Sequence, residues 1–147
     1  MSQPRLSSET VHATTVAKEG RAVLISGPSG SGKSDLALRL LDRGFTLVSD
    51  DQTLVRREDE RLIAAAPANI AGKLEIRGIG IVEMEHAGDT PVALLVELTS
   101  DIERLPDDSR ERPILGVSLP LISIDAMAAS APSKVAVALD RMGLKLQ

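Results

Sequence analysis

A glycine-rich segment of eight residues constrains the possible fold of this chain more than any other feature. A short apolar run, residues 22–25, leads into the segment, and an amphipathic run, residues 35–41, follows it. Strand, glycine-rich loop and helix is the context of a phosphate-binding loop. There the glycines allow backbone N–H groups to point at phosphate oxygens, and the helix N-terminus adds its positive dipole end. The segment reads Gly27-Pro28-Ser29-Gly30-Ser31-Gly32-Lys33-Ser34.

The motif predicts that the chain binds a nucleoside triphosphate such as ATP, with all eight residues in contact with it. Lys33 is placed to reach the β- and γ-phosphates, and the Ser34 hydroxyl is placed to bind Mg²⁺. The alternative, a Gly-Ser turn that merely starts a helix, does not need a lysine at this position.

Composition narrows the remaining function classes. The chain has 147 residues, which predicts one domain spanning 1–147, and it contains one Phe, no Trp, no Tyr and no Cys. Without an aromatic platform or a basic surface (the net charge is −4), we do not expect nucleic acid binding. The lack of cysteine and of a long apolar stretch favours a cytoplasmic location without a membrane span. Residues 1–10 are polar and are expected to be flexible.

The pattern along the chain predicts many strands and few helices. We expect one helix after the glycine-rich loop, a second over 133–142, and one helical turn within 67–72. This order differs from the regular strand–helix alternation of a nucleoside kinase. The expected strands are 14–17, 21–26, 45–48, 53–56, 61–64, 74–82 (apolar, with two glycines inside), 92–98 and one or two short strands within 114–124.

Two adjacent aspartates directly follow a predicted buried strand. Neighbouring residues of an extended chain point to opposite sides, so only one of Asp50 and Asp51 is expected to face the phosphates. A carboxylate there can hold Mg²⁺ or accept the proton of an attacking hydroxyl. The alternative is a solvated Asp-Asp turn.

Four further charged or ionisable residues stand out. Glu75 and Arg77 would share one face of a strand, either as an edge ion pair or as part of a site. His12 on its own is more often structural than functional. Arg104 could stabilise a transferring phosphate, although it also lies in a run of charges.

Taken together, these residues resemble the catalytic domain of HPr kinase/phosphorylase, from Val11 to about Leu105. This family phosphorylates a serine of HPr, the small phosphocarrier of the sugar phosphotransferase system. The resemblance implies an α/β, P-loop-containing, strand-rich mixed sheet with few helices, similar to phosphoenolpyruvate carboxykinase. The segments that resemble the family are Val11-His12-Ala13, the glycine-rich loop, Leu47-Val48-Ser49-Asp50-Asp51 and, most specifically, Glu75-Ile76-Arg77-Gly78-Ile79-Gly80.

The resemblance also implies a role for each matching residue. Asp51 would be the general base for the kinase reaction and the general acid for its reverse, with His12 beside it. Lys33 would hold the phosphates, and Ser34 and Glu75 would hold Mg²⁺. Arg104 would be the catalytic arginine, and the implied partners are ATP, HPr and further copies of the chain in a hexamer.

The sequence departs from the family in two places. The family's usual N-terminal domain has no counterpart in these 147 residues, as in the short form found in alphaproteobacteria. Residues 123–133 lack the basic residues and the Gly-Arg-Asn that the family uses for dephosphorylation. The kinase reaction is therefore expected, and the phosphorylase reaction is left open.

Two other functions remain compatible with the residues: a small-molecule kinase with the same loop, and a regulatory module that binds ATP without turnover. The apolar residues of the last predicted helix could pack on a neighbouring copy or on the chain's own core. They are Val135, Val137, Leu139 and Met142.

Overall fold

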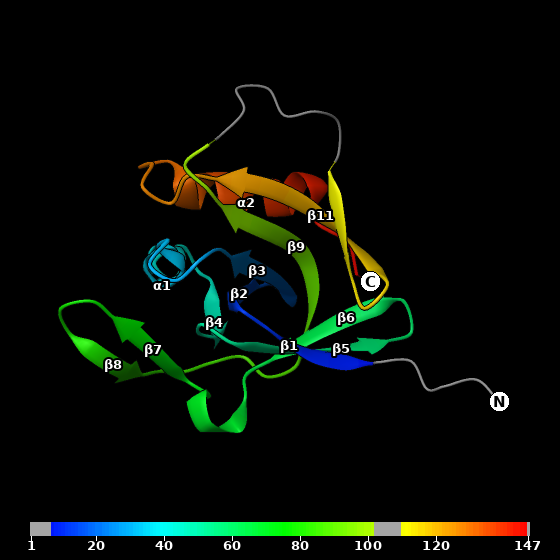
Figure 1. Cartoon of the computed structure of the whole chain (residues 1–147), viewed down its shortest axis with the longest axis horizontal. Helices are drawn as coiled ribbons and strands as arrows, with labels where there is room; N and C mark the ends of the chain where they lie inside the picture. Colours follow the sequence, from blue (N-terminus) through cyan, green and yellow to red (C-terminus); the bar gives the residue numbers. More distant parts are fainter. Residues whose placement is uncertain (1–6, 102–109, 147) are drawn as a thin grey trace.

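The computed structural model describes residues 7–101 and 110–146. In this part of the chain a nine-stranded sheet carries two helices, and a separate two-stranded hairpin projects from it (Figure 1). The helices are α1 (Lys33–Leu41) and α2 (Ala131–Met142), and η1 (Ala68–Ile70) is one 3₁₀ turn. The strands are β1 (Ser8–Val11), β2 (Ala13–Lys18), β3 (Arg21–Ser26), β4 (Thr46–Ser49), β5 (Thr53–Glu58), β6 (Arg61–Ala65), β7 (Lys73–Ile76), β8 (Gly80–Glu83), β9 (Thr90–Leu98), β10 (Glu111–Ile114) and β11 (Val117–Ile124).

The large sheet is mixed and branches at β9. Its main path runs β1-β5-β6-β9-β3-β2-β4, and β11, with β10 beside it, also pairs with β9. β9 runs parallel to both β3 and β11, whereas the other pairs are antiparallel. β3 ends at the glycine-rich loop, and α1 begins directly after that loop, so the strand–loop–helix order predicted for residues 21–41 is present.

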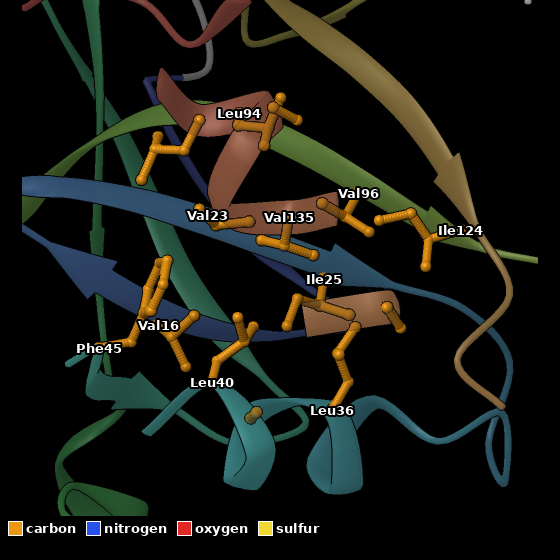
Figure 2. Close-up of a cluster of buried hydrophobic side chains, with 14 of the residues drawn as sticks. Val16, Val23, Ile25, Leu36, Leu40, Phe45, Leu94, Val96, Ile124 and Val135 are labelled. Atoms are coloured by element: carbon orange, nitrogen blue, oxygen red, sulfur yellow. The ribbon is translucent and has the colours of Figure 1, made fainter. Parts of the chain in front are cut away.

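The core lies on both faces of the central strands. Val23 and Ile25 of β3 face the cluster that contains the two helices, while Ala22 and Leu24 face the cluster on the other side of the sheet. This alternation follows from the two-residue period of a strand. Figure 2 shows Leu36 and Leu40 of α1 pointing from the helix toward the strands of the helix-side cluster.

Most of the predicted elements are present, including the helical turn after Pro67. The strand expected over 74–82 is instead the β7–β8 hairpin, which turns where Gly78 (φ +83°) and Gly80 (φ +112°) take positive φ. The two glycines thus serve the turn, since no atom lies within 4 Å of the position a Cβ would take at either one.

Two other expectations change at the ends of the chain. Residues 8–10, expected to be flexible, belong to β1 and pair with β5. In α2, Val135 and Leu139 are buried in the chain's own core, whereas Val137 and Met142 are exposed. No helix in the described ranges is long and apolar enough to cross a membrane.

Candidate active site

The glycine-rich loop is a tight turn in which Gly30 and Gly32 take the positive φ that favours glycine. Gly32 has φ +99° and immediately precedes α1, where the Leu36 N–H donates to the Gly32 carbonyl at 2.9 Å. A Cβ on Gly32 would lie 3.1 Å from the Cβ of Ala126, and one on Gly27 would lie 2.6 Å from Ser31 Oγ. Gly32 thus needs both its positive φ and the space that a side chain would take from Ala126.

Lys33 is buried inside this loop. Its ammonium group donates to the carbonyl oxygens of Gly27 at 2.9 Å and Pro28 at 3.1 Å. Because an ammonium group has three N–H donors, one remains for a phosphate oxygen. Ser31 Oγ is buried and has no hydrogen-bond partner among the described residues. A positive group and an unused polar atom in a glycine turn fit a phosphate chain.

Asp50 is a buried carboxylate at the end of β4 that joins three segments. Its Oδ1 accepts hydrogen bonds from Ser34 Oγ of α1 at 2.6 Å and from Thr14 Oγ1 of β2 at 3.1 Å. Its Oδ2 accepts the backbone N–H of Glu75 in β7 at 3.0 Å. A carboxylate held by three donors has a fixed direction, and here it is directed at the serine of the loop.

Asp51 is in contact with His12, as the family resemblance implies. His12 Nε2 lies 2.8 Å from Asp51 Oδ1, and both side chains are about half exposed or more, at 47% and 61%. No described residue donates a hydrogen bond to Asp51 Oδ2. Asp51 has φ +67°, so the chain is not extended here, and the alternation expected of neighbouring strand residues does not apply to the two aspartates.

Both aspartates border one hollow of about 290 Å³. Glu75 also lines it, and its exposed position contrasts with the buried Asp50. The expected Glu75–Arg77 ion pair is not formed among the described residues, because Arg77 lies in the hairpin turn, beyond the end of β7. The hollow is lined by Asp50, Asp51, Gln52, Pro67, Asn69, Ile70, Lys73, Glu75 and Ile81.

The donor set of the site suits Mg²⁺. The described residues contain no group of three His, Cys, Asp or Glu side chains that would form a complete metal cage. Mg²⁺ in phosphoryl-transfer sites does not need one, since it takes one or two protein oxygens and completes its shell with water and phosphates. The Ser34 hydroxyl and the Asp50 carboxylate are hard oxygen ligands already in contact.

Some residues of the site have a clear signal in the sequence, and others do not. Arg104 lies outside the described residues. Asp50 has no fixed role from sequence alone, and Thr14 gives only a weak signal, as a hydroxyl residue in a strand that is otherwise buried and apolar. The structure brings together Ser34, Asp50 and the Glu75 backbone on one side, and His12 with Asp51 on the other.

Comparison with known proteins gives one consistent family. The family model of the HPr Serine kinase C-terminal domain matches residues 5–145. The HPr kinase/phosphorylase of Lactiplantibacillus plantarum is 40% identical over 129 residues, which cover 79% of this chain and 41% of the relative. That of Xylella fastidiosa is 37% identical over 134 residues, covering 80% of this chain and 42% of the relative. This chain thus spans about two fifths of the length of these relatives.

A solved structure supports the same assignment. The Hpr(Ser) kinase/phosphatase from Coxiella burnetii matches with a TM-score of 0.78 at 30% identity, over 90% of this chain and 94% of that one. Its agreement confirms the predicted fold, a strand-rich mixed sheet with few helices, and the resemblance drawn from the sequence motifs. This chain belongs to the family of HPr serine kinase C-terminal domains.

Proposed function

We propose that this protein is an ATP-dependent kinase that phosphorylates a serine of HPr. The observation that carries the proposal is the pairing of two adjacent aspartates that border one hollow: Asp50 with Ser34 of the glycine-rich loop, and Asp51 with His12. The first pair suits a metal-bound phosphate, and the second suits proton removal from an attacking hydroxyl. The names of the relatives support HPr as the protein substrate.

The glycine-rich loop binds the phosphates of ATP in this proposal. The contacts come from residues 27–34, with their backbone N–H groups directed by the turn and by the N-terminus of α1. Lys33 is anchored by its two loop carbonyl partners and gives its third N–H to a phosphate oxygen. Positioning and charge neutralisation are the main requirements of phosphoryl transfer, so a preformed loop contributes directly to the rate.

Ser34 and Glu75 remain the predicted ligands for Mg²⁺, and the contact between Ser34 and Asp50 adds Asp50 to them. When bound, Mg²⁺ neutralises charge that develops on the phosphate oxygens. Because the Ser34 hydroxyl donates its proton to Asp50, its oxygen lone pairs would be the part available to hold the ion. Asp50 also accepts the backbone N–H of Glu75, and this hydrogen bond holds β7 close to Ser34.

Asp51 accepts the proton of the serine hydroxyl. Its Oδ1 is oriented by His12, and Oδ2 is the oxygen that remains for the incoming hydroxyl. The exposure of both side chains suits a protein substrate, because the acceptor serine must arrive on the surface of another folded molecule. Arg104, in the segment outside the described residues, is proposed to stabilise the transferring phosphate.

We propose a homo-oligomer, a hexamer by resemblance to the family, and the exposed Val137 and Met142 of α2 offer apolar surface for it. Sedimentation of the purified chain tests this.

The lack of cysteine supports a cytoplasmic location. Phosphorolysis of phosphorylated HPr is not part of the proposal, because residues 123–133 lack the family's basic motif.

The function is tested by incubating the protein with HPr from the same organism, ATP and Mg²⁺, and measuring the intact mass of HPr together with ATP consumed. The expected result is one phosphoserine per HPr and one ATP consumed per phosphoserine. Phosphate transfer to a small molecule in place of HPr would indicate a small-molecule kinase. Binding of ATP with no turnover would indicate a sensor, and either result would overturn the proposal.

A further inference from the structure

One buried hydroxyl connects the two aspartates of the site. Thr14 lies in β2 and its side chain is fully buried. Its Oγ1 donates to Asp50 Oδ1 at 3.1 Å and accepts the backbone N–H of Asp51 at 3.0 Å. A single side chain therefore contacts both the carboxylate that meets Ser34 and the backbone of the residue that meets His12.

These two contacts fix the direction of the hydroxyl proton. A hydroxyl has one proton to donate, and an N–H can only donate. Because Thr14 Oγ1 accepts the Asp51 N–H, its own proton is the one that lies toward Asp50 Oδ1. The arrangement has no freedom to reverse, so it holds Asp50 as an acceptor and holds the Asp51 N–H at the same time.

The backbone that Thr14 holds is in an uncommon conformation. Asp51 has φ +67°, and the Gln52 N–H donates to the Asp50 carbonyl at 2.7 Å, which closes a three-residue turn centred on Asp51. A non-glycine residue at positive φ costs free energy and persists only where the surroundings determine it. The hydrogen bond from the Asp51 N–H to Thr14 is a contact that stabilises this turn.

We propose that Thr14 is a positioning residue of the active site. It holds Asp50 against Ser34 and keeps the Asp51 turn in the conformation that places the carboxylate beside His12. The inference rests on the proposed function for its consequence in catalysis. Its first consequence, ordering of the two aspartates and of metal-dependent nucleotide binding, can be measured without any phosphate transfer.

The chain provides a matched control in the next residue. Thr15 lies in the same strand and is equally buried, but it points to the opposite face and its hydroxyl pairs with Thr53 Oγ1 at 2.8 Å. Replacing either threonine with valine removes one buried hydroxyl and keeps the shape. A purely structural role predicts the same outcome for Thr14→Val and Thr15→Val, whereas a positioning role predicts different ones.

The test compares the full chain with Thr14→Val, Thr14→Ser and Thr15→Val in three measurements. They are hydrogen exchange of the Asp51 amide in the nucleotide-free protein, ATP affinity with and without Mg²⁺, and kcat and KM for HPr phosphorylation. We expect Thr14→Val to lose protection at Asp51, and to lose about tenfold or more in Mg²⁺-dependent ATP affinity and in kcat. Thr14→Ser restores both, and Thr15→Val resembles the wild type in the site measurements.

Each outcome decides the question. Equal behaviour of Thr14→Val and Thr15→Val in exchange, affinity and kcat would overturn the inference. If neither valine variant yields folded protein, the alanine pair Thr14→Ala and Thr15→Ala is judged by the same criteria. If the wild type binds Mg²⁺ and ATP but does not phosphorylate HPr, the proposed function fails while exchange and affinity still judge Thr14. If the wild type binds no nucleotide, both fail.

Discussion

At the scale of single residues, the roles of the two aspartates depend on which of their oxygens already accept hydrogen bonds. Asp50 accepts three hydrogen bonds and is buried, so it acts as a fixed point between α1, β2 and β7. Asp51, one residue later, is exposed and has one oxygen without a donor among the described residues. Two adjacent carboxylates thus have different environments, which is how two identical side chains acquire different roles.

The first prediction concerns the partner of Asp51. Replacing His12 with Leu removes a hydrogen bond to a charged group, worth about 1.5–3 kcal/mol, so the transfer rate is expected to fall roughly 10- to 100-fold. ATP affinity should change little, because His12 does not contact the glycine-rich loop. Steady-state kinetics with HPr and a nucleotide-binding titration check both parts. A loss of ATP affinity as large as the loss of rate would contradict the assignment.

A second prediction at this scale concerns the glycine at the start of α1. Gly32→Ala must place a side chain at φ +99° and against Ala126, so it is expected to cost more than the roughly 1–2 kcal/mol of an αL residue alone. Gly78→Ala is the matched control, since Gly78 has φ +83° but open space around it. Urea unfolding measures the two costs. Equal costs would show that the contact with Ala126 is not significant.

At the scale of elements, the segment after β11 supports the glycine-rich loop. Arg39 of α1 donates to the carbonyl oxygens of Ala126 and Ala128, and its Nε lies 3.1 Å from Asp35. Ala126 in turn packs against Gly32. The arginine therefore fastens the 125–130 segment onto the helix that carries Lys33 and Ser34.

Loss of this connection gives the third prediction. Arg39→Ala is expected to destabilise the fold by about 2 kcal/mol, since it removes hydrogen bonds from a charged donor, and to weaken ATP binding. Asp35→Ala removes only an exposed ion pair of the helix and should cost less than about 0.5 kcal/mol. Thermal unfolding and an ATP titration of both variants test this. Similar effects of the two substitutions would exclude a role for the Ala126 and Ala128 contacts.

Some elements follow from the sequence and others do not, for identifiable reasons. The hairpin of residues 13–26, the helix after the loop and β9 follow from local apolar periodicity and turn residues. The β7–β8 hairpin does not, because a continuous apolar run with two glycines is also compatible with a single strand. At the site, the glycine-rich loop follows from its own pattern, whereas the Thr14–Asp50 contact joins residues 36 positions apart and has no local signal.

At the scale of the whole molecule, β3 connects the two halves of the core and the site. Its even and odd residues enter different hydrophobic clusters, and its end leads into the glycine-rich loop. The two clusters therefore share one strand and are expected to unfold together rather than as separate units.

The fourth prediction tests this coupling. Leu24→Ala removes a fully buried side chain from the cluster on the face away from the helices and should cost about 2–5 kcal/mol. Unfolding should remain a single transition when followed by far-UV circular dichroism and by Phe45 fluorescence, which reports on the helix-side cluster. Ile79→Ala, at an exposed hairpin position, is the control and should change stability by less than about 0.5 kcal/mol. Two separate transitions in Leu24→Ala would contradict the shared core.

The division of labour between the two aspartates is tested most directly by comparing Asp51→Asn with Asp50→Asn in nucleotide binding and phosphate transfer. Asp51→Asn should bind ATP with Mg²⁺ like the wild type and lose transfer to HPr by at least about a hundredfold, because it cannot accept the serine proton. Asp50→Asn should lose the part of ATP affinity that depends on Mg²⁺. Transfer by Asp51→Asn at the wild-type rate would contradict its role as the base.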